Sequence, residues 1–105
     1  MVSAVITKKD AFDRIAGCNR QLHRFGIRAI GVFGSFSRDQ ANDQSDVDIL
    51  VQFDAEKKTF DNFIETCFLL EKVLGRKVEL VTEESLSPYL KPYIMKELEY
   101  VPLSN

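Results

Sequence analysis

The sequence has no tryptophan, one histidine and only two cysteines among its 105 residues. Cys18 and Cys67 stand far apart, without CxxC or Cys/His ligand spacing, and each falls within an apolar helical pattern. We therefore expect two reduced core thiols. The pattern disfavours both a zinc site and a disulfide bond.

The chain also lacks a long hydrophobic run. Its first apolar residues give way to the charged residues Lys8, Lys9 and Asp10. This change comes too early for a signal peptide, and far too early for a membrane helix of about 20 apolar residues. We expect a cytoplasmic protein without a membrane partner.

An excess of positive charge is missing as well. The 14 Lys and Arg are outnumbered by 16 Asp and Glu, for a net charge of −2 and a pI of about 5.4. Binding along a nucleic-acid backbone rewards clustered Lys and Arg, so a long polynucleotide is not an expected partner. With 45% hydrophobic residues, a chain of this length predicts one globular domain over residues 1–105.

Helical and strand patterns alternate along the chain. Helical spacing of apolar residues predicts helices over 7–26, 59–75 and 87–102, each opened by a Ser or Thr cap and ended near Gly or Pro. Branched and aromatic residues predict strands over 27–33, 46–53 and 77–81. The order α-β-turn-β-α-β-α predicts an α+β fold with a small mixed three-stranded sheet.

Two acids lie at the start of the second predicted strand. Asp46 and Asp48 are two residues apart, so their side chains project from the same face of the strand. Such paired carboxylates repel unless a cation lies between them, and hard oxygen ligands suit Mg²⁺ together with phosphate oxygens. The alternative is a pair of acids at an exposed strand end.

A possible phosphate-binding turn precedes these acids. Gly34 follows a predicted buried strand and allows a sharp turn close to a ligand. The Ser35 hydroxyl, the free amides of the next helical turn and Arg38 can hold phosphate oxygens. The alternative is an ordinary Gly-Ser turn with a solvated arginine.

Together, the turn and the acids carry a family resemblance. The run GSFSRDQANDQSDVDILVQF resembles the signature of the DNA polymerase β-like nucleotidyltransferase superfamily, and GRKVELVTEESLSPYLKPYIMKELEYV resembles the end of its minimal nucleotidyltransferases. The resemblance implies a polymerase β-like palm fold. It implies that the nucleotide-binding residues are Gly34, Ser35, Arg38 and Ser45, and that the catalytic residues are Asp46, Asp48 and Glu79, which would also bind two Mg²⁺ ions.

The sequence departs from the family at two positions. Asp39 follows Arg38 where the family often has a small residue or glycine, which adds a negative charge near the expected phosphates. Glu79 matches a third carboxylate that is usually aspartate, and an exposed strand acid is its alternative reading. Because the extra methylene displaces the carboxylate, we expect a slow enzyme.

The resemblance also implies a reaction and a partner. AMP would pass from ATP to a hydroxyl group, with pyrophosphate as the leaving group. Since no residues remain for an acceptor-binding domain, we expect the acceptor to be small or to arrive on another protein. The resemblance implies a tyrosine of a HEPN toxin, which would make this chain the antitoxin of a heteromer. The alternative is a weakly active or inactive nucleotide-binding module that neutralises or scaffolds a partner by contact.

The last predicted helix supplies an expected partner surface. Its apolar positions, Tyr89, Leu90, Ile94 and Leu98, exceed what such a small core can cover. The alternative is that all four cap the sheet.

Overall fold

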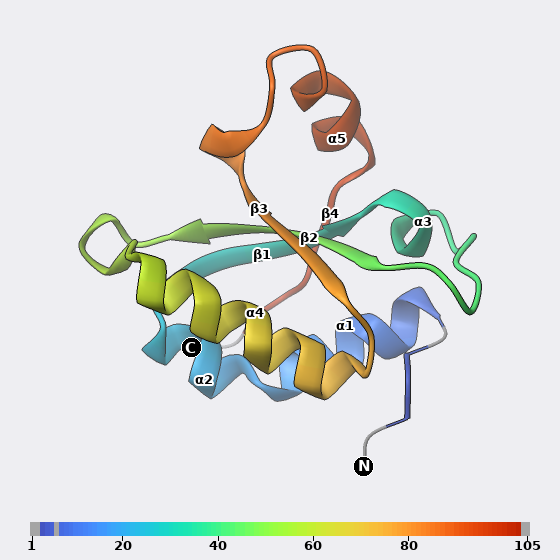
Figure 1. The fold of residues 1–105 in the computed structure, drawn as a ribbon, viewed down its shortest axis with the longest axis horizontal. Coiled ribbons are helices and arrows are strands. Elements are labelled where there is room, and N and C mark those ends of the chain that lie inside the picture. The colour runs from blue at the N-terminus through green and yellow to red at the C-terminus, as the bar shows by residue number, and fades with distance from the viewer. Residues whose placement is uncertain (1–2, 6, 104–105) are drawn as a thin grey trace.

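The computed structural model describes residues 3–5 and 7–103, and these build a mixed sheet with the strand order β3-β2-β1-β4. The strands are β1 (Ile27–Phe33), β2 (Val47–Phe53), β3 (Val78–Thr82) and β4 (Glu99–Tyr100). β2 runs parallel to β3, whereas β1 is antiparallel to both β2 and β4 (Figure 1). The prediction of three strands was therefore wrong by one, because β4 was read as the end of a helix.

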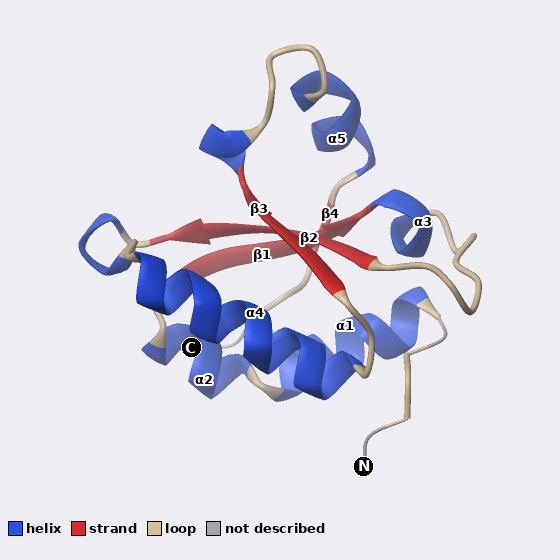
Figure 2. Ribbon diagram, viewed as in Figure 1, coloured by secondary structure: helices blue, strands red, loops and turns tan. Residues whose placement is uncertain are grey.

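Helices cover the sheet unequally. α1, α2 and α4 lie on one side of it, whereas α5 lies on the other side and α3 follows the end of β1 (Figure 2). Two 3₁₀ turns, η1 and η2, follow β2 and β3. The bounds are α1 (Lys8–Gly17), α2 (Asn19–Arg24), α3 (Gly34–Ser37), η1 (Ala55–Lys57), α4 (Phe60–Leu74), η2 (Glu83–Ser85) and α5 (Lys91–Glu97).

Local signals explain where α1 and α4 begin and end. The Thr59 hydroxyl accepts a hydrogen bond from the backbone N–H of Asn62 at 3.1 Å, and the Thr7 hydroxyl caps α1 in the same way. Gly75 closes α4 in the left-handed conformation, with φ of 68°. The predicted helix over 59–75 is thus confirmed within one residue at each end.

The first and last predicted helices needed correction. Cys18 leaves helical geometry, with φ of −105° and ψ of 23°, so the predicted helix over 7–26 is two helices; the break follows Gly17, a poor helix former. The last helix begins at Lys91 and ends before Leu98, whose extended backbone leads into β4.

The two faces of β2 have different surroundings. Val47, Ile49 and Val51 belong to the hydrophobic core beneath α1 and α4. The alternate residues face the other way, because successive side chains of a strand point to opposite faces. Asp48 is on this second face, where helical cover is incomplete. The carboxylates predicted for the site therefore lie on the side of the sheet away from the main core.

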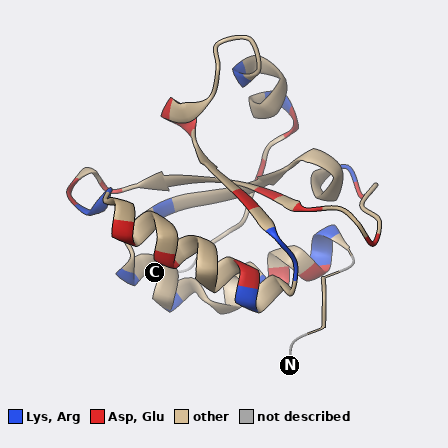
Figure 3. Cartoon of the chain, viewed as in Figure 1, with Lys and Arg blue, Asp and Glu red and all other residues tan. Residues whose placement is uncertain are grey.

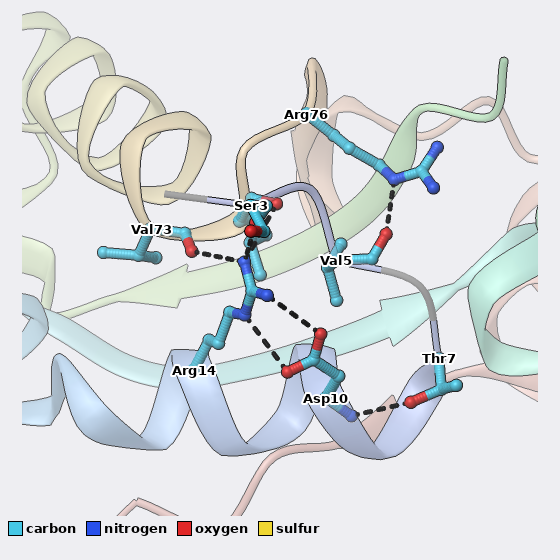
Figure 4. A network of polar contacts seen from close by, with 8 residues as sticks. Ser3, Val5, Thr7, Asp10, Arg14, Val73 and Arg76 are labelled. Atoms are coloured by element: carbon cyan, nitrogen blue, oxygen red, sulfur yellow. Dashed lines mark hydrogen bonds and ion pairs between the residues drawn. The ribbon is translucent and has the colours of Figure 1, made fainter. Parts of the chain in front are cut away.

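Arg14 and Arg76 bind the segment over residues 3–5 (Figure 4). Arg14 pairs with Asp10 at 3.0 Å and donates to the carbonyl of Val73 at 3.2 Å. Arg76 donates to the carbonyl of Val5 at 2.6 Å. Arg14 also donates to the carbonyl of Ser3, and the backbone N–H of Val5 donates to the carbonyl of Leu74, so residues 3–5 are held against the C-terminal end of α4.

Both cysteines are free thiols. Cys18 is buried in the core, as predicted, whereas Cys67 is only partly buried. Burial raises the pKa of each thiol, which lowers its reactivity. Among the described residues, no helix combines the length and the apolar character that crossing a bilayer requires.

Candidate active site

Asp48 is at the centre of the predicted site. It lies opposite Phe33 of β1 and Glu79 of β3 in the sheet register, and it is partly buried. Its pKa is raised from 3.8 to about 6, mainly by desolvation and then by the negative charges of Glu79, Asp46 and Glu97, while Arg38 acts in the opposite direction. The fold thus brings several like charges toward one half-buried carboxylate.

Asp46 and Glu79 are exposed beside it. Figure 3 shows acidic positions on the adjoining parts of β2 and β3 and near the end of α5. Within the described part of the chain, Arg38 is the cation that opposes these charges at Asp48. A cation placed among these acids would relieve their repulsion.

The arrangement by itself is not a complete metal cage. In the described part of the chain, no three Asp, Glu, His or Cys side chains are grouped so that they could enclose a metal ion. Mg²⁺ commonly takes only one or two carboxylates and completes its shell with water and substrate phosphates. The paired acids therefore fit Mg²⁺ that arrives with a nucleotide.

Gly34 is required by its packing against Asp48. Its φ is 73°, and a Cβ atom built there would lie 2.1 Å from Oδ2 of Asp48. Any larger residue would move that carboxylate or the turn. The backbone N–H of Gly34 donates to Oε1 of Glu97 at 3.0 Å, so this amide is engaged within the protein and does not point freely at a ligand.

Ser35 and Arg38 flank the same short turn. Ser35 is partly exposed in α3, and Arg38 follows the last residue of α3. The guanidinium of Arg38 donates to Oε1 of Gln40 at 3.1 Å and pairs with Oε2 of Glu97 at 2.6 Å. The structure therefore brings the predicted arginine to the edge of the acidic site, with a carboxylate beside it.

Ser45 shapes the loop before β2. Its hydroxyl accepts a hydrogen bond from the backbone N–H of Asn42 at 2.9 Å. Its carbonyl accepts from Arg76 at 3.1 Å, as does the carbonyl of Asn42 at 2.8 Å. The guanidinium of Arg76 also lies 5.2 Å from the ring centre of the buried Phe36. Arg76 thus links the loop that leads into Asp46 to α3.

Asp39, at which the sequence departs from the family, is bound to the start of α1. Its backbone has φ of 54°, a left-handed conformation that glycine adopts freely and aspartate tolerates. Its carboxylate accepts a hydrogen bond from the backbone N–H of Lys8 at 3.0 Å, at the start of α1. The departure from the family thus fits the backbone, and the charge is used to cap a helix.

Sequence reasoning missed Glu97 and left Arg76 without a role. Glu97 is 63 residues from Gly34 and 59 from Arg38, and no local motif indicates contacts over such separations. Arg76 reaches the loop across 31 to 34 residues. Only the packing of α5 and the turn before β3 reveals these two contributions.

The segment over residues 83–98, here called the α5 arm, carries an exposed apolar surface. The prediction that the core cannot cover all its apolar residues is confirmed. Ile94 and Leu98 are partly buried, whereas other large side chains face solvent. The exposed ones are Tyr89 at 86%, Tyr93 at 74% and Leu90 at 56%.

The chain thus combines a mixed sheet, paired acids at the start of β2 and a Gly-Ser-x-x-Arg turn after β1. The family model described as "Nucleotidyltransferase domain" matches residues 13–101. The chain belongs to this family and is a nucleotidyltransferase.

Two relatives of similar length are named as protein adenylyltransferases. Protein adenylyltransferase MntA of Thermococcus cleftensis is 39% identical over 99 residues, covering 93% of this chain and 99% of the relative. A candidate protein adenylyltransferase of Methanocaldococcus jannaschii is 39% identical over 80 residues, covering 74% of this chain and 80% of the relative.

Solved structures share the fold. A candidate minimal nucleotidyltransferase aligns with a TM-score of 0.78 and 29% identity, covering 96% of this chain and 100% of that one. A toxin-antitoxin structure with AMP-PNP aligns with a TM-score of 0.68 and 23% identity over 90% of this chain and 74% of that one. The minimal nucleotidyltransferase fold predicted from the sequence is thereby confirmed.

Proposed function

We propose that this chain is a cytoplasmic, Mg²⁺-dependent protein adenylyltransferase that transfers AMP from ATP to a tyrosine of a HEPN toxin and so acts as its antitoxin. The arrangement around Asp48 carries the proposal, because a half-buried acid among like charges fits a metal-bound triphosphate held beside Arg38. The name of the Thermococcus relative supports the reaction class.

The acceptor is proposed from a structural relative. One solved complex is described as a tri-AMPylated HEPN toxin of Shewanella oneidensis with its MNT antitoxin, and it aligns with a TM-score of 0.63 and 21% identity over 93% of this chain and 74% of that one. The exposed apolar side chains of the α5 arm give this chain a surface suited to a protein acceptor. Tyrosine hydroxyls of the partner are therefore the proposed acceptors.

The residues take the following parts in the proposed reaction. Asp46 and Asp48 would hold Mg²⁺, and Ser35 and Arg38 would hold the outer phosphates. The metal held there would supply positive charge to the attacking and the departing oxygen. The acceptor oxygen forms a bond to the α-phosphorus while the bond to the bridging oxygen breaks and pyrophosphate leaves. Glu79 is the proposed base that receives the hydroxyl proton.

Two of the predicted residues have structural contacts that define their part more closely. Gly34 contributes the space that Asp48 fills, and its N–H is occupied by Glu97. The hydroxyl of Ser45 accepts a hydrogen bond from Asn42 and so stabilises the loop that leads into β2. We propose that Gly34 and Ser45 support nucleotide binding by holding Asp48 and Asp46 in place.

Isothermal calorimetry tests the proposal at its first step. ATP should bind in the presence of Mg²⁺ and lose its affinity when the metal is chelated, because Asp46, Asp48 and Glu79 otherwise repel the triphosphate. The double variant Asp46→Asn, Asp48→Asn should fold normally and lose Mg²⁺-dependent binding. Equal ATP affinity with and without chelator would rule out the metal-bridged site. A chain that binds a HEPN protein without binding ATP would favour neutralisation by contact.

A further inference from the structure

Glu97 binds both ends of the turn from Gly34 to Arg38, the proposed phosphate-binding turn. Its Oε1 accepts from the backbone N–H of Gly34, where the turn begins, and its Oε2 accepts from Nη1 of Arg38, where the turn ends. Ser35 lies between these two points. One carboxylate from α5 therefore spans the whole turn that the nucleotide is proposed to contact.

The backbone of Glu97 strengthens this connection. Its carbonyl accepts a hydrogen bond from the buried Ser37 hydroxyl at 2.6 Å. α5 and α3 are thus joined through both the main chain and the side chain of one residue. A carboxylate held this way has little freedom to swing aside, and charge-assisted bonds to an arginine are among the stronger hydrogen bonds in proteins.

The contacts leave Arg38 able to bind a phosphate. Among the described residues, Gln40 and Glu97 take two of the five N–H donors of the guanidinium. The remaining donors lie in the same plane, whose direction these two bonds fix. An arginine already fixed in position loses less side-chain entropy when it binds a phosphate.

We propose that Glu97 is a positioning residue for nucleotide binding, which acts by orienting Arg38 and bracing the turn that carries Ser35. This inference rests on the proposed function, because it assigns Glu97 to the same nucleotide site. In this proposal Glu97 bonds to Arg38 and to the turn rather than to the nucleotide, and most of its influence on the nucleotide passes through Arg38.

A double-mutant cycle with direct binding tests the inference. Glu97→Gln keeps the size of the side chain but removes its charge, and it should weaken Mg²⁺-ATP binding by roughly tenfold in calorimetry. In an Arg38→Met background, the same substitution should change the affinity by less than about twofold. Glu99→Gln is the matched control, since Glu99 pairs with Lys8 and not with Gly34 or Arg38, and the ATP affinity of this variant should equal that of the native chain.

A spectroscopic measurement covers the case of an unstable variant. The Nη1–H of Arg38 that donates to Glu97 should exchange more slowly with solvent in the native chain than in Glu97→Gln and the shorter Glu97→Asp. Tighter ATP binding by Glu97→Gln would overturn the inference, because Glu97 would then compete with the phosphates for Arg38. Equal losses in both backgrounds would also overturn it.

The experiment also separates this inference from the proposed function. Absence of Mg²⁺-ATP binding by the native chain would overturn both. Binding by the native chain together with unchanged binding by the Glu97 variants would overturn this inference alone.

Discussion

Asp48 is placed where its charge is costly to the folded chain. Its pKa is about 6 in the fold against an ordinary 3.8, so folding favours the protonated carboxyl. The ionised carboxylate therefore lowers the free energy of unfolding. This loss of stability is absent below pH 3.8, grows as the pH rises, and is complete above the folded-state pKa of about 6. The acid that the proposed reaction needs therefore lowers the stability of the metal-free protein at neutral pH.

Replacement of Asp48 by a neutral residue should remove this loss of stability. In the metal-free chain, Asp48→Asn should raise the free energy of unfolding by about 1 to 3 kcal/mol above pH 6, and the gain should disappear as the pH falls toward 4. Denaturant unfolding at a series of pH values measures it. Asp54→Asn, at an exposed position beyond the other end of β2, is the control. A gain that is the same at every pH would contradict the assignment of the cost to ionisation.

Glu79 allows a test of the third carboxylate. Glu79→Gln should lower transfer on the order of 10²-fold, and its exposed position predicts little loss of stability. Glu79→Asp should retain or raise the rate, because the shorter side chain restores the usual family residue. The rates are measured with labelled ATP. If neither substitution changes transfer, Glu79 is only an exposed strand acid, and the mechanism rests on Asp46 and Asp48.

Gly34 should tolerate no side chain. Gly34→Ala forces a non-glycine residue to φ of 73° and places a Cβ 2.1 Å from Oδ2 of Asp48. The expected loss of stability is about 2 kcal/mol or more, with weakened ATP binding. Gly17→Ala is the matched control, because nothing lies within 4 Å of the added Cβ, and it should be neutral or slightly stabilising. Thermal unfolding that treats both substitutions alike would refute the steric argument.

At the scale of elements, the α5 arm is the part of the fold most suited to partner contact. Leu90→Ser and Tyr93→Ser remove apolar surface that is exposed in the chain alone, so they should weaken binding of a HEPN protein while ATP affinity stays unchanged. Phe68→Ser is the control, since Phe68 is also exposed but lies on α4, across the sheet from α5 (Figure 2). Surface plasmon resonance would measure the partner affinities. Equal losses for all three variants would contradict the assignment of the surface to the arm.

The elements differ in how far the sequence predicts them. α4 was predictable because a cap, a long apolar stripe and a terminal glycine all agree. β4 was not, since Glu99–Tyr100 is too short for a strand pattern and its pairing partner β1 is about 70 residues away. The break at Cys18 has only one weak local signal, Gly17, because the apolar spacing continues through it.

The candidate site divides in the same way. The residues from Gly34 to Asp48 form one continuous motif, so a linear pattern was enough to bring them together. Glu97 and Arg76 act through contacts made only after folding. The sequence also could not show that Asp39 binds the backbone N–H of Lys8 at the start of α1.

At the scale of the whole molecule, the sheet separates stability from function. The core of buried aliphatic side chains lies between one face and the helices α1, α2 and α4, while the acids lie on the other face. The acidic site is therefore free to carry repulsive charges as long as the opposite face holds the fold together. The α5 arm stands on the same side as the acids (Figure 1), so a partner bound to the arm would lie near the nucleotide.

The central claim is that this chain moves AMP onto a partner protein. Incubation of the purified chain with α-labelled ATP, Mg²⁺ and the HEPN protein of the same genome measures it directly. We predict label on a tyrosine of the HEPN protein, no label with γ-labelled ATP, and none with the Asp46→Asn, Asp48→Asn variant. A HEPN protein that binds the native chain and is silenced by it, yet stays unlabelled, would contradict the account.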